Sequence, residues 1–204
     1  METNSYSIAM KNSKSIILAF SLFFIAISVL AQQTETRTPG NFTKIYSGGS
    51  WDVIVQKGNK DEVRLESTNI SLDKVITEVE NNTLKISLEK GNYRNIGLTV
   101  YVTVREVEGL KSTGSGSIKM QSDISAGSLS LGNTGSGSVI LKNVNADNLS
   151  VGLTGSGIVS IAGGTVGTLS VSQTGSGDFK GSELVAEEAS INKTGSGQSY
   201  IGMV

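Results

Sequence analysis

The tetrapeptide Thr-Gly-Ser-Gly occurs five times in the second half of the chain, and this repeat limits the possible folds more than any other feature. Its copies begin at residues 113, 134, 154, 174 and 194, so they are spaced by 21, 20, 20 and 20 residues. A period of this length is typical of stacked repeat units rather than of one closed globule. The repeat therefore predicts a solenoid in which each unit adds one coil.

Within each unit, apolar residues alternate with polar ones as in a β-strand, and the apolar columns of residues 139–151 return over 159–171. No segment after Gly40 shows the apolar stripe of a helix. Short strands and a fixed glycine corner every twenty residues or so predict an all-β fold, a parallel β-helix. Glycine is needed where the backbone turns sharply or adopts positive φ. The predicted corner residues are Gly114, Gly116, Gly135, Gly137, Gly155, Gly157, Gly175, Gly177, Gly195 and Gly197.

Residues 41–110 lack the tetrapeptide but keep the alternation of strands. Strands are predicted over 52–55, 62–65, 84–88 and 98–104, with glycine and asparagine turns between them. We interpret 41–110 as irregular, wider first coils and 111–204 as the repeat coils of the same domain, because no linker-like stretch divides them. A separate small β domain is the alternative. The polar residues 32–40 are predicted to be a disordered leader.

The N-terminus has the pattern of an export signal. Lys11 and Lys14 precede an apolar run over 16–30, and small residues follow at 29–31. The run is short for a membrane span, which needs about 20 residues. We therefore predict a cleaved signal peptide over 1–31 and a protein at the cell surface, secreted or periplasmic, with a retained membrane anchor as the alternative.

The composition removes most catalytic chemistry. The chain contains no histidine and no cysteine, which excludes Cys/His zinc sites and nucleophiles that are activated by histidine. The 17 basic and 18 acidic residues balance, so no overall charge favours nucleic acid. The glycine-rich repeats precede strands rather than helices, which argues against a phosphate-binding loop. We expect no cofactor and no metal.

Carboxylates are the remaining route to an enzyme, since polysaccharide lyases and hydrolases on β-helices use clustered acidic residues. The acidic residues of the repeat coils occupy different columns, so adjacent coils do not align them. They are Asp123, Asp147, Asp178, Glu183, Glu187 and Glu188. The sequence therefore favours a non-enzymatic protein, and a carboxylate-based polysaccharide-active enzyme is the less favoured hypothesis.

Two kinds of side chain are candidates for ligand contact. Serines recur between inward apolar residues of the last strand of each unit and predict an outward ladder of hydroxyls, at Ser130, Ser150, Ser170 and Ser190. Such a ladder is also compatible with a self-satisfied, solvated surface. Aromatic rings stack on sugars and anchor interfaces, and the candidates are Tyr101, Trp51, Tyr93 and Tyr200. Tyr101 lies between inward valines and is predicted to point outward, whereas Trp51 could instead be a cap or core residue.

The order of the sequence motifs resembles that of a known protein family. The segments "GSWDVIVQKG", "NNTLKISLEKG", "GLTVYVTV" and "VEGLKSTGSGSI" precede the repeated tetrapeptides. This arrangement, over roughly residues 41–204, resembles the head-GIN-domain family of putative autotransporter adhesins of Gram-negative bacteria. The resemblance implies a single-chain, right-handed β-helix and an adhesin role, and it supplies no catalytic residues.

Together these observations predict an exported, non-catalytic binding module of the cell envelope that makes shallow, multivalent contacts along one flank of the β-helix. Its partner would be a glycan or protein at the cell surface. A structural envelope protein without an external ligand is the alternative. The last coil is predicted to be open, which would allow self-association through unpaired strand edges.

Overall fold

The computed structural model describes residues 32–203, and the predicted signal peptide over 1–31 lies outside these residues. Residues 32–203 are almost entirely strands and turns, with one short 3₁₀ helix, η1 (Leu72–Lys74). Within this described part, no helix has the length and hydrophobicity of a membrane span.

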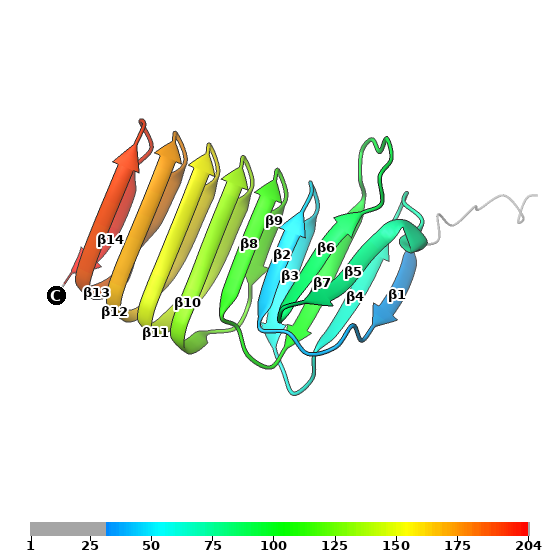
Figure 1. Cartoon of the computed structure of the whole chain (residues 1–204), viewed down its shortest axis with the longest axis horizontal. Coiled ribbons are helices and arrows are strands. Elements are labelled where there is room, and N and C mark those ends of the chain that lie inside the picture. Colours follow the sequence, from blue (N-terminus) through cyan, green and yellow to red (C-terminus); the bar gives the residue numbers. More distant parts are fainter. Residues whose placement is uncertain (1–31, 204) are drawn as a thin grey trace, which may run out of the picture. The chain divides into compact units, whose positions relative to one another are not determined.

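The repeat region forms stacked parallel coils, which confirms the β-helix prediction (Figure 1). Strand β9 (Ser117–Met120) and strand β10 (Ile124–Gly135) form the first full coil, and strand β8 (Gly109–Gly114) is the part of the preceding coil that pairs with the end of β10. Each of the next coils is one long bent strand: β11 (Ser138–Gly155), β12 (Ile158–Gly175) and β13 (Asp178–Thr194). Strand β14 (Ser199–Met203) covers part of β13.

Residues twenty positions apart lie side by side in these coils, so the sequence repeat is also the structural repeat. Leu129 pairs with Leu149, and Leu149 pairs with Leu169. Strand alternation turns these side chains inward, where all three are at most 2 % exposed. The buried columns form one core that continues along the coils.

The tetrapeptide forms the corner between two consecutive strand segments. Its first glycine has a φ between +105° and +124° in all five copies, a conformation that L side chains rarely adopt. Its second glycine lies so close to the previous turn that an added Cβ would overlap a backbone oxygen. Both positions therefore require glycine, the first for its backbone conformation and the second for the close approach of the neighbouring backbone.

The N-terminal region continues the same sheet. Strand β2 (Lys44–Gly48) lies parallel between β8 and β6 (Thr83–Leu88), and β3 (Asp52–Lys57) lies parallel between β9 and β7 (Leu98–Val104). Strands β4 (Glu62–Ser67) and β5 (Val75–Glu80) instead pair antiparallel with β7 and β6. These antiparallel ladders depart from the simple run of coils that the sequence predicts.

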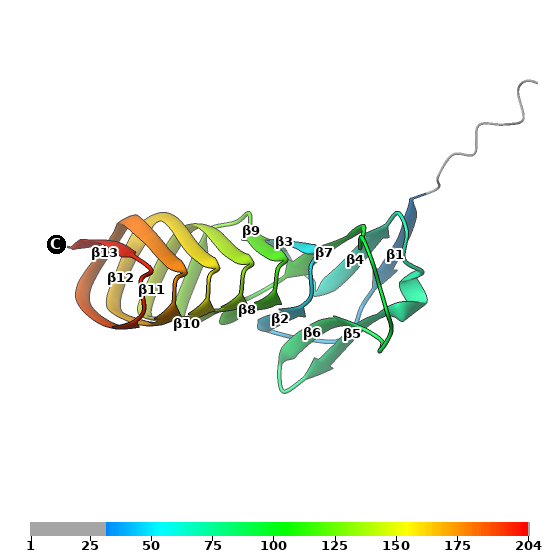
Figure 2. The ribbon, with the colours of Figure 1, turned by 90° about the horizontal axis from the view of Figure 1, so that it is seen from above.

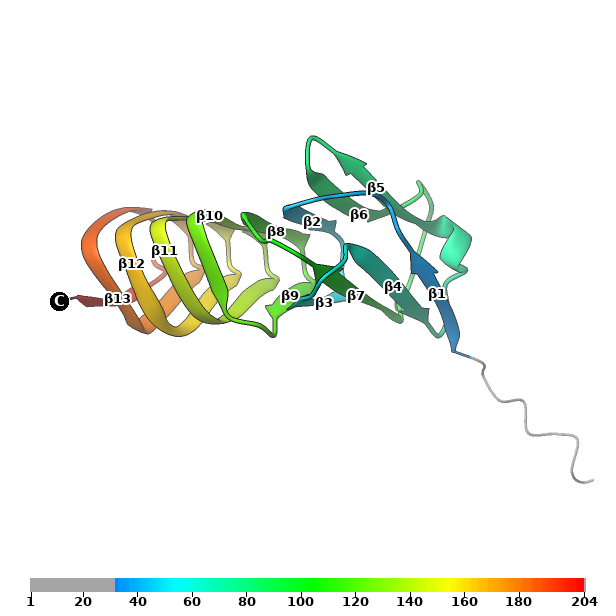
Figure 3. The same ribbon diagram turned by 90° about the horizontal axis from the view of Figure 1, so that it is seen from below.

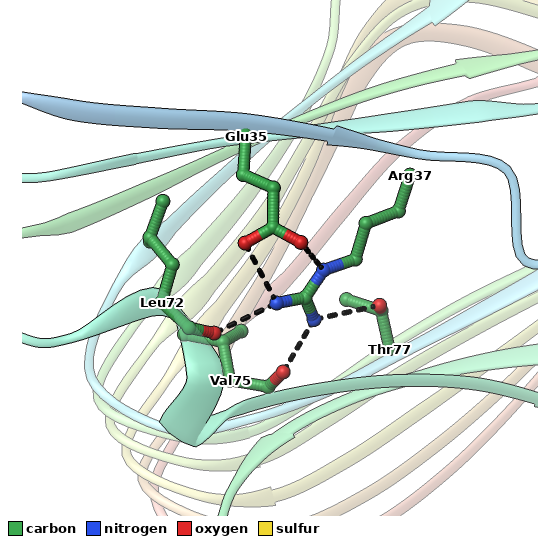
Figure 4. A network of polar contacts seen from close by, with 5 residues as sticks. All are labelled: Glu35, Arg37, Leu72, Val75 and Thr77. Atoms are coloured by element: carbon green, nitrogen blue, oxygen red, sulfur yellow. Dashed lines mark hydrogen bonds and ion pairs between the residues drawn. The ribbon is translucent and has the colours of Figure 1, made fainter.

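The prediction that residues 32–40 are disordered is wrong for residues 33–37, which form strand β1 (Gln33–Arg37). Strand β1 pairs antiparallel with β4. The Arg37 guanidinium donates hydrogen bonds to the carbonyls of Leu72 and Val75 and to the Thr77 hydroxyl, and it pairs with Glu35 (Figure 4). A polar segment is ordered here because both its backbone and its arginine find partners.

Two outward faces run along residues 32–203, and Figures 2 and 3 show them on opposite sides of the ribbon. The serine flank is the face of β5, β6, β2 and β8 and of residues 128–135, 148–155, 168–175 and 188–194. The tyrosine flank is the face of β1, β4, β7, β3 and β9, of residues 138–141, 158–161 and 178–181, and of β14.

Candidate functional site

The predicted serines form one row on the serine flank. Ser130 pairs in register with Ser150, Ser150 with Ser170, and Ser170 with Ser190, and all four side chains are exposed. They point outward because their neighbours in sequence, such as Leu149 and Val151, are buried. Lys44 and Gly109 extend the row toward the N-terminal region.

The rows beside these serines consist of small or polar side chains. Two residues earlier in each coil lie Ser128, Asn148, Thr168 and Glu188, and two residues later lie Gly132, Gly152, Ser172 and Asn192. Glycines, serines and threonines rise little above the sheet. The centre of the serine flank is therefore a low, hydroxyl-rich surface.

Part of this surface is the floor of a groove with a volume of about 1010 Å³. Ser130, Ser150 and Ser170 line the groove, whereas Ser190 lies outside it. Residues 105–108, which we call the wall, also line the groove, as do Lys44, Lys57 and residues 125–127. We call this hollow the serine groove.

The wall is fastened to the rest of the sheet by an ion pair at its start. Arg105 Nη2 lies 2.6 Å from Asp61 Oδ2, and the Arg105 backbone N–H donates to Asp61 Oδ1 at 3.0 Å. Burial raises the pKa of the Asp61 carboxyl, but the hydrogen bonds from Arg105 outweigh burial and hold the pKa below its ordinary value. Asp61 therefore keeps its negative charge at neutral pH and holds the wall in place.

The far end of the wall is held by backbone contacts. The Glu108 N–H donates to the Thr43 carbonyl at 2.8 Å, and the Glu108 carbonyl accepts from the Ser130 N–H at 2.9 Å. The wall of the groove thus connects β2 with the first serine of the row.

The aromatic candidates lie elsewhere. Tyr101 is half-buried on the tyrosine flank, and the Arg64 guanidinium carbon lies 4.0 Å from the centroid of its ring. Tyr200 is 46 % exposed on β14, at the other end of the row that contains Tyr101 and Lys180. Neither ring shares a surface with the serines.

The interpretation of Trp51 as a contact residue is wrong, since its side chain is only 3 % exposed. Its ring packs against Gly49, where any Cβ would overlap it, so Trp51 belongs to the core. Tyr93 is half-buried beside Gly91, in the segment between β6 and β7. Of the predicted contact residues, the structure brings together only Ser130, Ser150 and Ser170 in one groove.

Tyr46 is an aromatic residue that the sequence reasoning missed. It is half-buried on the serine flank, in register with Lys85 of β6 and Lys111 of β8. A second hollow of about 550 Å³ includes these three residues and Lys44, and it shares Lys44 and Ser130 with the serine groove. The sequence signal was the alternation in "KIYSG", which places Lys44 and Tyr46 outward on either side of buried Ile45.

A column of inward polar side chains at the corners was also missed. The residue before each of three tetrapeptides, Ser112, Asn133 or Gln173, is buried and donates to the carbonyl of the second glycine of that corner. Leu153 occupies the same position in the coil between Asn133 and Gln173. The sequence feature that could have predicted this column is position, since each of these residues directly precedes a Thr-Gly-Ser-Gly copy.

Across residues 32–203, acidic side chains do not gather in a group of three that could hold a metal ion. Two acidic residues of the repeat coils instead bind their neighbours: Asp123 accepts from the Asn143 side-chain amide at 3.1 Å, and Asp178 accepts from the Gln198 N–H at 2.9 Å. These carboxylates help to hold successive coils together.

Several solved structures share this fold. A putative adhesin from Parabacteroides distasonis is similar over 83 % of this chain and 81 % of that chain, at 17 % identity with a TM-score of 0.68. A putative adhesin from Parabacteroides merdae is similar over 85 % and 96 %, at 12 % identity with a TM-score of 0.62. A putative adhesin from Bacteroides fragilis is similar over 85 % and 93 %, at 17 % identity with a TM-score of 0.61. At sequence identities this low, the structural similarity shows that the fold is shared.

A search among curated protein sequences gives no match to this chain. The family comparison is more informative, because its match extends over residues 41–203 and so includes both the N-terminal strands and all the repeat coils. The chain belongs to the family described as "Putative auto-transporter adhesin, head GIN domain".

Proposed function

We propose that this protein is an exported, non-catalytic binding module of the bacterial cell envelope, and that it holds its ligand against the serine groove. The observation that carries the proposal is the alignment of Ser130, Ser150 and Ser170 in one register on the floor of that groove. The adhesin names of the family and of the similar structures support a binding role.

The geometry suits an extended, hydroxyl-rich polymer such as a glycan. Successive coils lie about 4.8 Å apart, so the row offers a hydroxyl donor and acceptor at each such step. Each contact is weak because the surface is shallow and solvated. Affinity would arise from many contacts made at once along the row.

The contacts of the acidic residues support a role without catalysis. Asp123 and Asp178 already accept hydrogen bonds from the next coil. Glu106 and Glu108 line the serine groove, but they belong to its wall rather than to its floor of serines. A carboxylate enzyme would instead need a pair of acidic groups placed on either side of a scissile bond.

A matched pair of variants tests the proposal. Ser150→Tyr fills the floor of the serine groove, whereas Ser160→Tyr adds the same ring to the outward row of the tyrosine flank. In a glycan and matrix-protein array probed with the purified protein, we expect Ser150→Tyr to abolish the binding that wild type and Ser160→Tyr retain. Equal binding by both variants would remove the serine groove from consideration.

The alternative of a structural envelope protein rests on the last coil. Ile191 of β13 is 40 % exposed, although Val171 and Val151 at the same position in earlier coils are at most 1 % exposed. Self-association through this edge would appear in light scattering and would be reduced by Ile191→Lys. An array without any binding, together with such self-association, would favour the structural role.

Exposure of the protein on the cell is tested by protease treatment of intact cells. Degradation on whole cells is the expected result for a surface binding module. Survival of the protein until the outer membrane is opened would place it in the periplasm and contradict adhesion to an outside target.

A further inference from the structure

The second hollow of the serine flank has a different chemistry from the serine groove. Lys44, Lys85 and Lys111 line it, and Glu80 is the one acidic residue of its lining. Lys85 pairs with Glu80. Within residues 32–203, the amines of Lys44 and Lys111 form no ion pair. The hollow therefore carries two lysines without an ion pair in the described part of the chain, and Glu106 and Glu108 are the acidic residues that line the adjoining serine groove with Lys44.

These two lysines lie across glycines of the next strand. The Lys44 Cγ is 3.2 Å from the position that a Cβ of Gly109 would occupy, and the Lys111 Cγ is 3.1 Å from the corresponding position at Gly132. A Cβ at 109 or 132 would press against these stems, which would have to shift by a few tenths of an ångström. The Lys44 stem therefore leans over Gly109 toward the serine row, and the Lys111 stem leans over Gly132 in the row beside it.

An aromatic side chain lies beside one of these lysines. Tyr46 is in register with Lys85 on one side and Lys111 on the other. Its ring leans along β2 over Gly48, whose Cβ position is 3.3 Å from Tyr46 Cε1. A half-buried ring beside Lys111, which forms no ion pair within residues 32–203, combines a stacking surface with a positive charge that can bind an anion.

We propose that this hollow, which we call the lysine–tyrosine site, binds a carboxylated sugar unit of an acidic polysaccharide whose chain continues into the serine groove. The sugar carboxylate pairs with Lys44 and Lys111, and the apolar face of the sugar ring stacks on the aromatic ring of Tyr46. Lys44 and Ser130 line both hollows, so one polymer can occupy them together. This inference rests on the proposed function, because it names the class of ligand for the same flank.

An uncharged sugar polymer serves as the matched probe. The full-length protein is titrated with oligogalacturonate and with the methyl ester of the same oligosaccharide, in which each carboxylate is replaced by an uncharged ester group. We expect the acid form to bind about tenfold more tightly, because two exposed ion pairs of about threefold each multiply to this factor. The double variant Lys44→Gln/Lys111→Gln should lose this preference and still bind the ester.

Two controls separate this site from general charge effects. Lys142→Gln/Lys180→Gln removes the same charge from exposed positions outside the site, and it should keep the preference for the acid form. Tyr46→Leu should weaken binding of both forms by about tenfold, the upper end of an aromatic stacking contribution. Thermal unfolding of each variant establishes that the fold persists.

The outcomes distinguish the two proposals. Equal binding of acid and ester, with loss of both in Ser150→Tyr, would overturn the acidic ligand and leave the serine groove as a glycan site. Binding of anionic lipid vesicles or duplex DNA as tightly as oligogalacturonate would overturn the inference in favour of unspecific charge attraction. Absence of any sugar binding, with no effect of Ser150→Tyr, would overturn both proposals.

Discussion

The two regions of the sheet hold their strands together by different means. From β8 to β14 every ladder is parallel and pairs equivalent positions of successive coils, whereas β1 to β7 include three antiparallel ladders. Within residues 32–203, every ion pair joins residues between Glu35 and Lys119. The repeat coils depend on the backbone and a continuous core, and the N-terminal region depends on individual side-chain partners.

This difference explains where chemical variety is found. Each repeat coil pairs with equivalent positions of its neighbours, and on the serine flank its outer rows hold mostly small or polar side chains. The N-terminal strands are free of this constraint and carry lysines, arginines and tyrosines. The boundary between the regions, at β2, β8 and β10, is where a repetitive hydroxyl surface meets specific charges.

The largest effect is expected at a glycine corner of the repeat coils. Gly155→Ala places a Cβ 2.7 Å from the Gly135 carbonyl oxygen at a φ of +105°, and we expect it to cost about 3 kcal/mol of unfolding free energy or more. Gly152→Ala is the control, because its Cβ would meet only the Leu131 oxygen at 4.0 Å. Denaturant unfolding that gave equal losses for both variants would contradict the corner requirement.

A smaller and more local effect is expected in the N-terminal region. Arg37→Ala removes hydrogen bonds to Leu72 and Thr77 of 2.7 and 3.1 Å, and we expect a loss of about 2 kcal/mol for charged hydrogen bonds of this kind. Hydrogen exchange should become faster in β1 and β5 but not in β11 and β12. Arg37→Lys, which keeps the charge without the forked donors, should recover only part of the loss.

The wall of the serine groove gives a dependence on pH. The pKa of Asp61 is lower in the folded than in the unfolded chain, so its contribution is present above the unfolded value of about 3.9 and is lost as pH falls through the folded pKa. Since Arg105 is half-exposed, the contribution is about 1 kcal/mol or less. In thermal unfolding at neutral and acidic pH, Asp61→Asn should lose less stability than wild type on acidification.

The smallest effect is expected at the inward polar column. Asn133→Leu copies the residue that the next coil already has at Leu153, and the Gly137 carbonyl keeps its backbone donor, the Ile158 N–H, at 3.0 Å. We expect a change in unfolding free energy of less than about 1 kcal/mol. Gln173→Leu should cost more, because the Ser199 hydroxyl donates to the Gln173 side chain at 2.7 Å. The reverse order would contradict this reading of the column.

Much of the fold could be predicted because the repeat coils obey one local rule. The spacing of the tetrapeptides alone places Ser130 beside Ser150 and Ser170, and glycine chemistry alone explains the corners. The same rule failed for polar residues 33–37, whose order depends on β4 and on the contacts of Arg37 far along the chain. Local patterns predict contacts between equivalent positions but not contacts between unlike segments.

The candidate site shows the same limit. Lys85 and Lys111 meet Tyr46 only because β6 and β8 lie on either side of β2, and nothing in the spacing of these residues indicates it. Trp51 gives the opposite case: an aromatic residue predicted as a surface contact is buried in the core, because its ring packs over the adjacent glycine turn. Its burial depends on the space that Gly49 leaves for the ring, and the sequence periodicity does not predict such a local contact.

The stacking of glycine on glycine at each corner has an evolutionary consequence. A twenty-residue unit that brings its own corner glycines can be duplicated or deleted without redesign of its neighbours, since each coil meets a copy of itself on either side. Every such event would change the length of the hydroxyl row by one step of about 4.8 Å and leave the charged N-terminal end untouched. The length of the hydroxyl row and the charged residues at its N-terminal end can therefore evolve separately.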